Sequence, residues 1–167
     1  MSMKRLLVIG LAGLALLATA YLALGRAWNQ KADRAGLFMP DNPATVALGR
    51  KLYASNCAAC HGNNLEGQVA DWRSPGPDGL MPAPPHNETG HTWHHPDQVL
   101  FEITKFGIVA AANLKNYRTA MPIYEGVLSD EEIIAVLSFI KSTWPEEIRL
   151  GHDEMNTRYA LEPPETR

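Results

Sequence analysis

Cysteine is nearly absent from this chain of 167 residues, which contains only Cys57 and Cys60. Two cysteines so close in sequence close no useful loop, so a disulfide framework does not stabilise this fold.

Basic residues are scarce after residue 40, where 17 acidic side chains outnumber 10 basic ones and the net charge is near −7. This balance argues against nucleic acid as a partner. No internal repeat is present, and the length and composition predict one small globular domain with accessory segments.

The amino-terminal segment contains a long stretch without charge. Lys4 and Arg5 precede an apolar run from Leu6 to Gly25, and a helix of about 20 residues spans about 30 Å, the thickness of the hydrocarbon core. The apolar region of a secretory signal peptide is shorter, roughly 7 to 15 residues. We therefore expect residues 1–27 to form an uncleaved transmembrane anchor, the alternative being a signal-like segment.

Residues 28–42 would then tether the anchor to the globular part of the chain. Trp28 would suit the membrane interface, where tryptophan is enriched. The positive-inside tendency keeps Lys4 and Arg5 in the cytoplasm and sends the rest of the chain outward.

The segment before the cysteines is predicted to be helical. Small or apolar residues recur at helical spacing within 43–56, and Asn42 can serve as the N-cap. A continuation of this helix would place Cys57, Cys60 and His61 at positions i, i+3 and i+4, on one face. A flat macrocycle could be held against that face.

A loop and further helices are predicted after the cysteines. Residues 71–96 contain six of the twelve prolines and are expected to wrap around the domain as a loop. A short helix with Pro96 in its first turn is expected to end at Gly107, and a second is expected at 108–116.

The last helix has the clearest start signal. Ser129 and Glu132 form a capping box, an apolar stripe follows, and Pro145 stops the helix. The domain is therefore expected to span residues 43–145. The polar tail 146–167 is expected to be loosely packed or draped over the domain.

The sequence Cys57-Ala58-Ala59-Cys60-His61 carries the candidate chemistry. A Cys-x-x-Cys pair can be a redox dithiol, half of a zinc site or a haem attachment, and the histidine that follows favours haem. Zinc would need two more ligands, and no second Cys-x-x-Cys or His-x-x-x-His pair stands at a familiar distance.

The order of helix, Cys-x-x-Cys-His, proline-rich loop, short helices, Met-Pro loop and capped helix resembles the class I cytochrome c family over roughly residues 43–145. The resemblance implies an all-α fold of about four to five helices around one covalent haem c, in addition to the transmembrane helix. It also implies that Cys57 and Cys60 bind the haem through thioethers. His61 would be the proximal iron ligand and Met121 the sixth ligand.

The resemblance also implies a contact between the first and last helices. In the family a small residue and an aromatic residue meet where these helices cross. Here Gly49 and Tyr53 would pack against Phe139 or Ile140.

Met121 lies 60 residues after the proximal histidine and precedes Pro122, as the family pattern requires. Met39, Met81 and Met155 are rival thioethers, and methionine is also a common core residue. Met81 precedes a proline too, but it lies too near the proximal side, where His61 is, to be the expected sixth ligand.

Three further residues are candidate haem contacts. The carbonyl of Pro85 or of Pro84 would accept a hydrogen bond from His61 Nδ1, unless these prolines only stiffen the loop. Trp93 and Arg118 resemble groups that reach haem propionates. The alternatives are a core tryptophan and a solvated arginine.

A histidine cluster occupies the same region and comprises His86, His91, His94 and His95. With Glu88 it could bind copper or another divalent ion. The favoured interpretation is that these rings pack around the haem edge. The string from Ala83 to Gly107 also resembles a subgroup of short, membrane-attached bacterial cytochromes.

The sequence thus predicts a membrane-anchored mono-haem cytochrome c that transfers single electrons on the periplasmic face of a bacterial inner membrane. It would be an electron carrier and not an enzyme, with a low-spin haem. Its partners would be respiratory or other redox membrane complexes, with no small-molecule substrate. The alternatives are a permanent haem subunit of a larger dehydrogenase or oxidase complex, or a gas-binding or copper-binding haem protein.

Overall fold

The computed structural model describes residues 36–161. The predicted transmembrane anchor at residues 1–27 lies outside the described residues, as does the first part of the expected tether. Among the helices at 36–161, none has the length and apolar character needed to cross a membrane.

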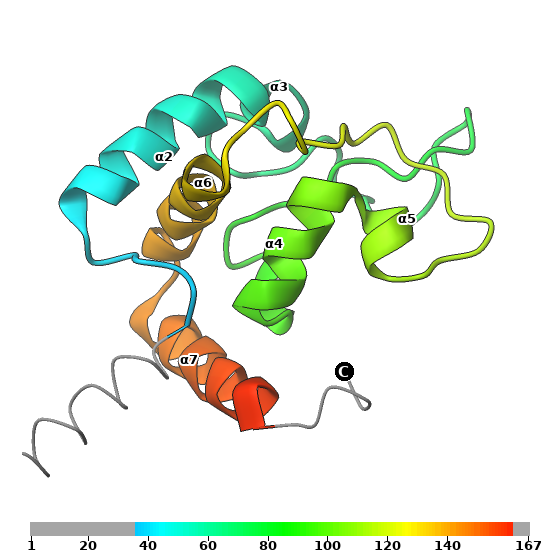
Figure 1. The fold of residues 1–167 in the computed structure, drawn as a ribbon. Helices are drawn as coiled ribbons and strands as arrows, with labels where there is room; N and C mark the ends of the chain where they lie inside the picture. The colour runs from blue at the N-terminus through cyan, green and yellow to red at the C-terminus, as the bar shows by residue number, and fades with distance from the viewer. Residues whose placement is uncertain (1–35, 162–167) are drawn as a thin grey trace, which may run out of the picture. The chain divides into compact units, whose positions relative to one another are not determined.

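Every regular element within residues 36–161 is helical, which confirms the predicted all-α class (Figure 1). The elements in chain order are α2 (Pro43–Asn56), α3 (Ala58–His61), the 3-10 turn η1 (Thr92–His94), α4 (Asp97–Phe106), α5 (Ile108–Ala111), α6 (Asp130–Ser142) and α7 (Glu146–Leu161). Extended backbone pairs in this part of the chain only as isolated β-bridges, one of which joins Met81 to Thr119.

Side-chain caps start the two longest helices of the predicted domain. The side chain of Asn42 accepts hydrogen bonds from the backbone N–H groups of Ala44 and Thr45, each at 3.1 Å. At the start of α6, Ser129 Oγ accepts from Glu132 N at 3.2 Å, and Ser129 N donates to Glu132 Oε2 at 2.8 Å. These caps satisfy backbone donors that a helix leaves without partners, so both predicted starts are confirmed.

Helices α2 and α6 pack closely against each other in the core. A Cβ atom on Gly49 would overlap the carbonyl oxygen of Ala135, so glycine allows the two backbones to approach. The rings of Tyr53 and Phe139 meet edge to face, with centroids 5.4 Å apart. The contact that the family resemblance implied at Gly49, Tyr53 and Phe139 is therefore present.

Helix α5 is shorter than the helix expected at 108–116. It ends at Ala111, because Asn113 and Asn116 have φ angles of 47° and 64°, outside the right-handed helical region. Asparagine tolerates this left-handed backbone better than most residues. The chain beyond α5 is therefore irregular up to α6.

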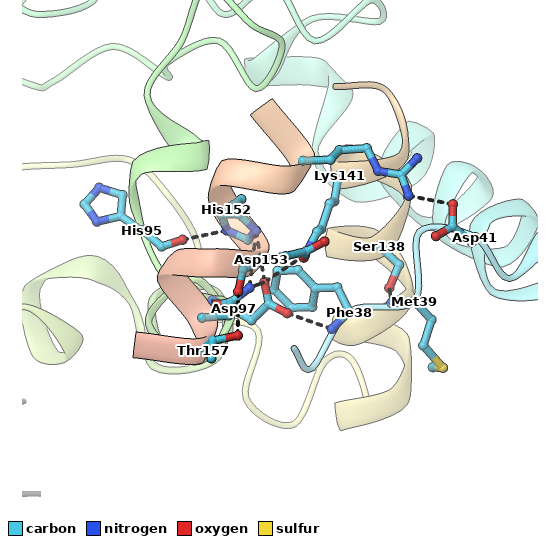
Figure 2. Close-up of polar contacts among 12 residues, drawn as sticks. Phe38, Met39, Asp41, His95, Asp97, Ser138, Lys141, His152, Asp153 and Thr157 are labelled. Carbon is cyan, nitrogen blue, oxygen red and sulfur yellow. Dashed lines mark hydrogen bonds and ion pairs between the residues drawn. The ribbon is translucent and has the colours of Figure 1, made fainter. Parts of the chain in front are cut away.

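The tail after Pro145 differs most from expectation. Residues 146–161 form α7, with His152 and Asn156 buried in the contact with the domain (Figure 2). Pro145 does end α6, but its carbonyl accepts from Ile148 N and Arg149 N and so starts α7. The buried residues of α7 are polar, so apolar periodicity could not reveal this helix.

Part of the expected tether also packs onto the domain. Phe38 is buried, and its N–H donates to Asp97 Oδ2 at 2.9 Å. The N–H of Met39 donates to Ser138 Oγ at 2.9 Å. Figure 2 shows both bonds. The compact unit therefore begins at Gly36, earlier than the domain start expected at residue 43.

Candidate functional site

The cysteines and His61 lie at the junction of α2 and α3. The N–H of Cys57 still bonds to Tyr53 O at 2.9 Å, while its carbonyl accepts from His61 N at 2.9 Å. Cys57 is half-buried, Cys60 is exposed and both are free thiols, whereas His61 is only 7% exposed. A short helical turn thus presents two thiols and one buried imidazole together.

Two tyrosine hydroxyls hold the ends of this turn. Tyr53 Oη donates to Gly62 O at 2.8 Å, just after His61. Tyr124 Oη donates to Asn56 O at 2.6 Å, just before Cys57. Burial raises the pKa of Tyr53, and it raises the pKa of Tyr124 to about 12, so both hydroxyls stay protonated donors. The role of Tyr124 was not predicted, because no local pattern connects it to a residue 68 positions earlier.

The environment of the thiols does not fit a redox dithiol. Burial raises the pKa of Cys57 to about 11, against the opposing effect of a hydrogen bond from Tyr124. A reactive Cys-x-x-Cys motif needs a lowered thiol pKa, so that the thiolate forms near neutral pH.

The described residues also contain no group of three or more His, Cys, Asp and Glu side chains arranged to hold a metal ion. The histidine cluster of His86, His91, His94 and His95 lies within these described residues. The rings of that cluster pack instead against aromatic neighbours, for example His91 against Trp72 with centroids 4.8 Å apart.

His61 is oriented by Pro84. Its Nδ1 lies 2.8 Å from Pro84 O, and because a carbonyl only accepts, Nδ1 carries the proton. Burial lowers the pKa of His61, although this hydrogen bond opposes the effect, and the ring is therefore neutral. Nε2 is left unprotonated, as a metal ligand requires. The prediction of Pro85 as this partner is therefore wrong, because the carbonyl of Pro85 lies 3.4 Å from Thr92 Oγ1.

The loop that carries Pro84 is fastened to the chain after His61. Gln68 N donates to Ala83 O at 2.9 Å, and His86 N donates to Leu65 O at 2.8 Å. A Cβ atom on Gly90 would overlap Pro85 O, so only glycine allows the loop to fold back this tightly. The Pro84 carbonyl that accepts from His61 is thus held in place by backbone contacts.

Met121 lies in the irregular segment before α6 and is half-buried, with its N–H donating to Thr119 Oγ1 at 3.0 Å. Met81 lies beside the same segment, because its N–H donates to Arg118 O at 3.0 Å and it pairs with Thr119. Met81 is therefore close to the segment that carries Met121, although it lies nearer to His61 in the sequence. Met121 remains the predicted sixth ligand, and Met81 is its nearest rival along this bridge.

The remaining predicted contacts have different surroundings. Trp93 Nε1 and His91 Nδ1 are the buried side-chain polar atoms that lack a hydrogen-bond partner in the described part of the chain. Trp93 Nε1 carries a hydrogen and can only donate, and an orphaned buried donor costs about 1–3 kcal/mol, so this atom fits a site in which a bound group supplies an acceptor. A haem propionate is such an acceptor. Arg118 Nη1 instead donates to Asp78 O at 3.1 Å, and its contact with a propionate stays a prediction.

A sequence model described as "Cytochrome c" matches residues 46–144, which include α2, the cysteines, His61, Met121 and α6. The chain belongs to the cytochrome c family. It is also similar to cytochrome c6 of Tetradesmus obliquus, with 32% identity over 98 residues that cover 58% of this chain and 89% of the relative. No solved structure gives a significant match.

This cytochrome c carries one covalently bound haem c, for which Cys57 and Cys60 supply the thiols of the attachment motif. The free thiols, the neutral imidazole of His61 and the orphaned donor of Trp93 all fit this group. The protein is a haem electron carrier of class I type and not a catalytic enzyme. Helix α7 follows the part of the chain that the family model covers.

Proposed function

We propose that this cytochrome c carries single electrons between redox membrane complexes on the periplasmic face of a bacterial inner membrane, anchored there by residues 1–27. His61 and Met121 ligate a low-spin haem iron in this proposal. The observation that carries it is the 2.8 Å hydrogen bond between His61 Nδ1 and Pro84 O, which leaves Nε2 free beside two free thiols.

The haem supplies a one-electron couple between ferric and ferrous iron. The chain supplies two neutral ligands, the imidazole of His61 and the thioether of Met121. Neither compensates the charge of the iron, so this pair favours the ferrous state and raises the reduction potential relative to two histidines or a thiolate. Tyr53 and Tyr124 keep the ligand segment rigid. These features suit a carrier at the high-potential end of a redox chain.

A second candidate is a permanent subunit of a larger dehydrogenase or oxidase complex. The packing of Phe38 and Met39 onto the domain supports it, because only residues 28–35 remain between the anchor and the compact unit. About eight residues reach at most about 28 Å when fully extended. A carrier with this tether would exchange electrons only with complexes that come close to it in the membrane plane.

Visible spectra of the detergent-purified protein, oxidised and reduced, test the ligation. We expect a low-spin spectrum with the far-red band of methionine-ligated ferric iron and no response to carbon monoxide. Met121→Ala should abolish the band and open the site to carbon monoxide, whereas Met81→Ala should leave both unchanged. Loss of the band in Met81→Ala alone would identify Met81, and not Met121, as the sixth ligand. A wild-type protein that binds carbon monoxide readily would support the gas-binding alternative instead.

Membrane fractionation tests the anchor. The full chain should resist extraction from membranes by alkaline carbonate, and a chain that starts at residue 28 behind a cleavable signal should be released as a soluble haem protein. The intact mass of the purified protein shows whether residues 1–27 are retained.

A native mass in mild detergent equal to one chain supports the carrier, and a stable stoichiometric complex supports the fixed subunit.

A further inference from the structure

His86 is the residue of the histidine cluster that touches the iron ligand. Its ring lies nearly flat on the ring of His61, with centroids 4.0 Å apart and an angle of 21° between the planes. The ring of Tyr53 meets His86 from another direction, with centroids 6.4 Å apart and an angle of 73°.

Contacts from three different segments hold His86 in place. Its N–H donates to Leu65 O at 2.8 Å, and its carbonyl accepts from Trp144 Nε1 at 2.8 Å. On the ring, Nδ1 lies 2.8 Å from Thr92 Oγ1. Because both the backbone and the ring are fixed, His86 presents a rigid face to His61 rather than a mobile side chain.

With the hydrogen bond to Pro84 alone, the plane of the His61 ring could still rotate about the line from Nδ1 to the carbonyl oxygen. A flat neighbour at van der Waals distance removes that freedom, because any rotation would drive the two rings together. The two contacts are therefore complementary. Pro84 sets the tautomer and direction of the His61 ring, and His86 sets its plane.

We propose that His86 is a positioning residue for the iron ligand, which fixes the plane of the His61 ring and lowers the reduction potential of the haem. This inference rests on the proposed ligation of iron by His61. A ligand ring carries more positive charge when the iron is ferric than when it is ferrous. The π face of an aromatic neighbour attracts positive charge, and the attraction is stronger away from water. The stack thus stabilises the ferric state relative to an aliphatic neighbour.

Three variants separate the face of the ring from its hydrogen bond. His86→Leu removes both, His86→Phe keeps an aromatic face without Nδ1, and Thr92→Val removes only the partner of Nδ1. Redox titration of the purified holoprotein should show a higher midpoint potential in His86→Leu, equivalent to about a threefold increase in the ferrous-to-ferric ratio at fixed potential. His86→Phe and Thr92→Val should stay close to wild type. Electron paramagnetic resonance of the ferric protein should show altered g values in His86→Leu alone.

His152→Leu is the matched control for lost stability, since it replaces another buried histidine that makes no ring contact with His61. It should lower the midpoint of chemical unfolding without moving the potential. An unchanged potential and unchanged g values in His86→Leu would overturn the inference, as would equal shifts in His86→Leu and His86→Phe. A wild-type protein without a low-spin spectrum would instead mean that the proposed ligation has failed.

Discussion

Gly49 shows how a single residue controls the packing of the core. A Cβ atom there would overlap the carbonyl oxygen of Ala135 and lie 2.9 Å from Phe139 Cβ. Gly49→Ala must therefore push α2 and α6 apart, and we expect it to lower the free energy of unfolding by about 3 kcal/mol. Chemical denaturation of the holoprotein measures this loss.

Gly151 in α7 provides the matched control, because a Cβ atom there would meet nothing within 4 Å. Gly151→Ala should stabilise the protein by about 0.5–1 kcal/mol, since alanine has the higher helix propensity. Equal effects of the two substitutions would show that backbone propensity, and not close packing of α2 on α6, decides the outcome at Gly49.

The candidate site was predictable where its signal is local. The spacing of Cys57, Cys60 and His61 depends only on one helical turn, and the structure builds that turn. The choice of Pro84 over Pro85 as partner of His61 depends on how the loop 62–87 closes. Two adjacent carbonyls point in different directions from the backbone, so sequence position alone could not distinguish them.

Among the elements, α7 is held by a buried polar cluster in addition to the packing of Ile148 against the core. Asn156 Oδ1 accepts from Asp97 N at 2.8 Å, and its Nδ2 donates to Asp97 Oδ1 at 3.0 Å. Lys141 Nζ lies 3.7 Å from the same carboxylate oxygen and 2.6 Å from Asp153 Oδ1. His152 Nε2 bonds to His95 O at 2.9 Å, as Figure 2 shows. These contacts join α4, α6 and α7 at one buried point.

Asn156→Ala tests this attachment. It leaves the buried N–H of Asp97 without a partner and removes one donor from Asp97 Oδ1, which keeps Lys141 Nζ at 3.7 Å, and we expect a loss of about 2–3 kcal/mol. Limited proteolysis should then cut within 146–161 faster than in wild type. Glu154→Ala on the exposed side of α7 is the control, since Glu154 forms a solvent-exposed ion pair with Arg158 at 4.0 Å, and the substitution should change stability by less than about 0.5 kcal/mol. Intact α7 in Asn156→Ala would argue against the attachment.

The same contacts predict a pH dependence. Burial lowers the pKa of His152, and the charge of Lys141 lowers it further, while Asp97 and Asp153 oppose these effects. The native state therefore resists protonation, and the unfolded chain takes up the proton near its ordinary pKa of about 6.5. This contribution to stability is complete above about pH 6.5 and is lost as the pH falls below it, by up to about 1.4 kcal/mol per pH unit.

His152→Gln should reduce the loss of unfolding free energy at acidic pH, because glutamine does not titrate and its amide can still donate to His95 O. Unfolding free energies of the holoprotein at several pH values between 7.5 and 5 measure the slope. An identical slope in the variant and the wild type would assign the acid sensitivity to other histidines of the domain.

For the whole molecule, the excess of acidic side chains after residue 40 predicts the response to salt. An anionic oxidant should react slowly with the reduced protein at low ionic strength and faster as salt is added, and a cationic oxidant should show the opposite trend. Stopped-flow oxidation of the detergent-purified protein by ferricyanide and by a cationic cobalt complex measures both trends. Parallel trends for the two reagents would mean that the haem edge does not sense the net charge.

The sequence by itself determined the elements whose signals lie within a few residues. These are the capped helices α2 and α6, the ligand turn and the all-α class, because caps and helical periodicity are local interactions. Other contacts could be known only from the three-dimensional structure. Pro84 accepts a hydrogen bond from His61, and His86 stacks on the same ring. Met81 lies beside the Met121 segment, and α7 packs onto the domain. Each of these contacts closes a loop of many residues, and its geometry depends on how the whole domain packs rather than on local preference.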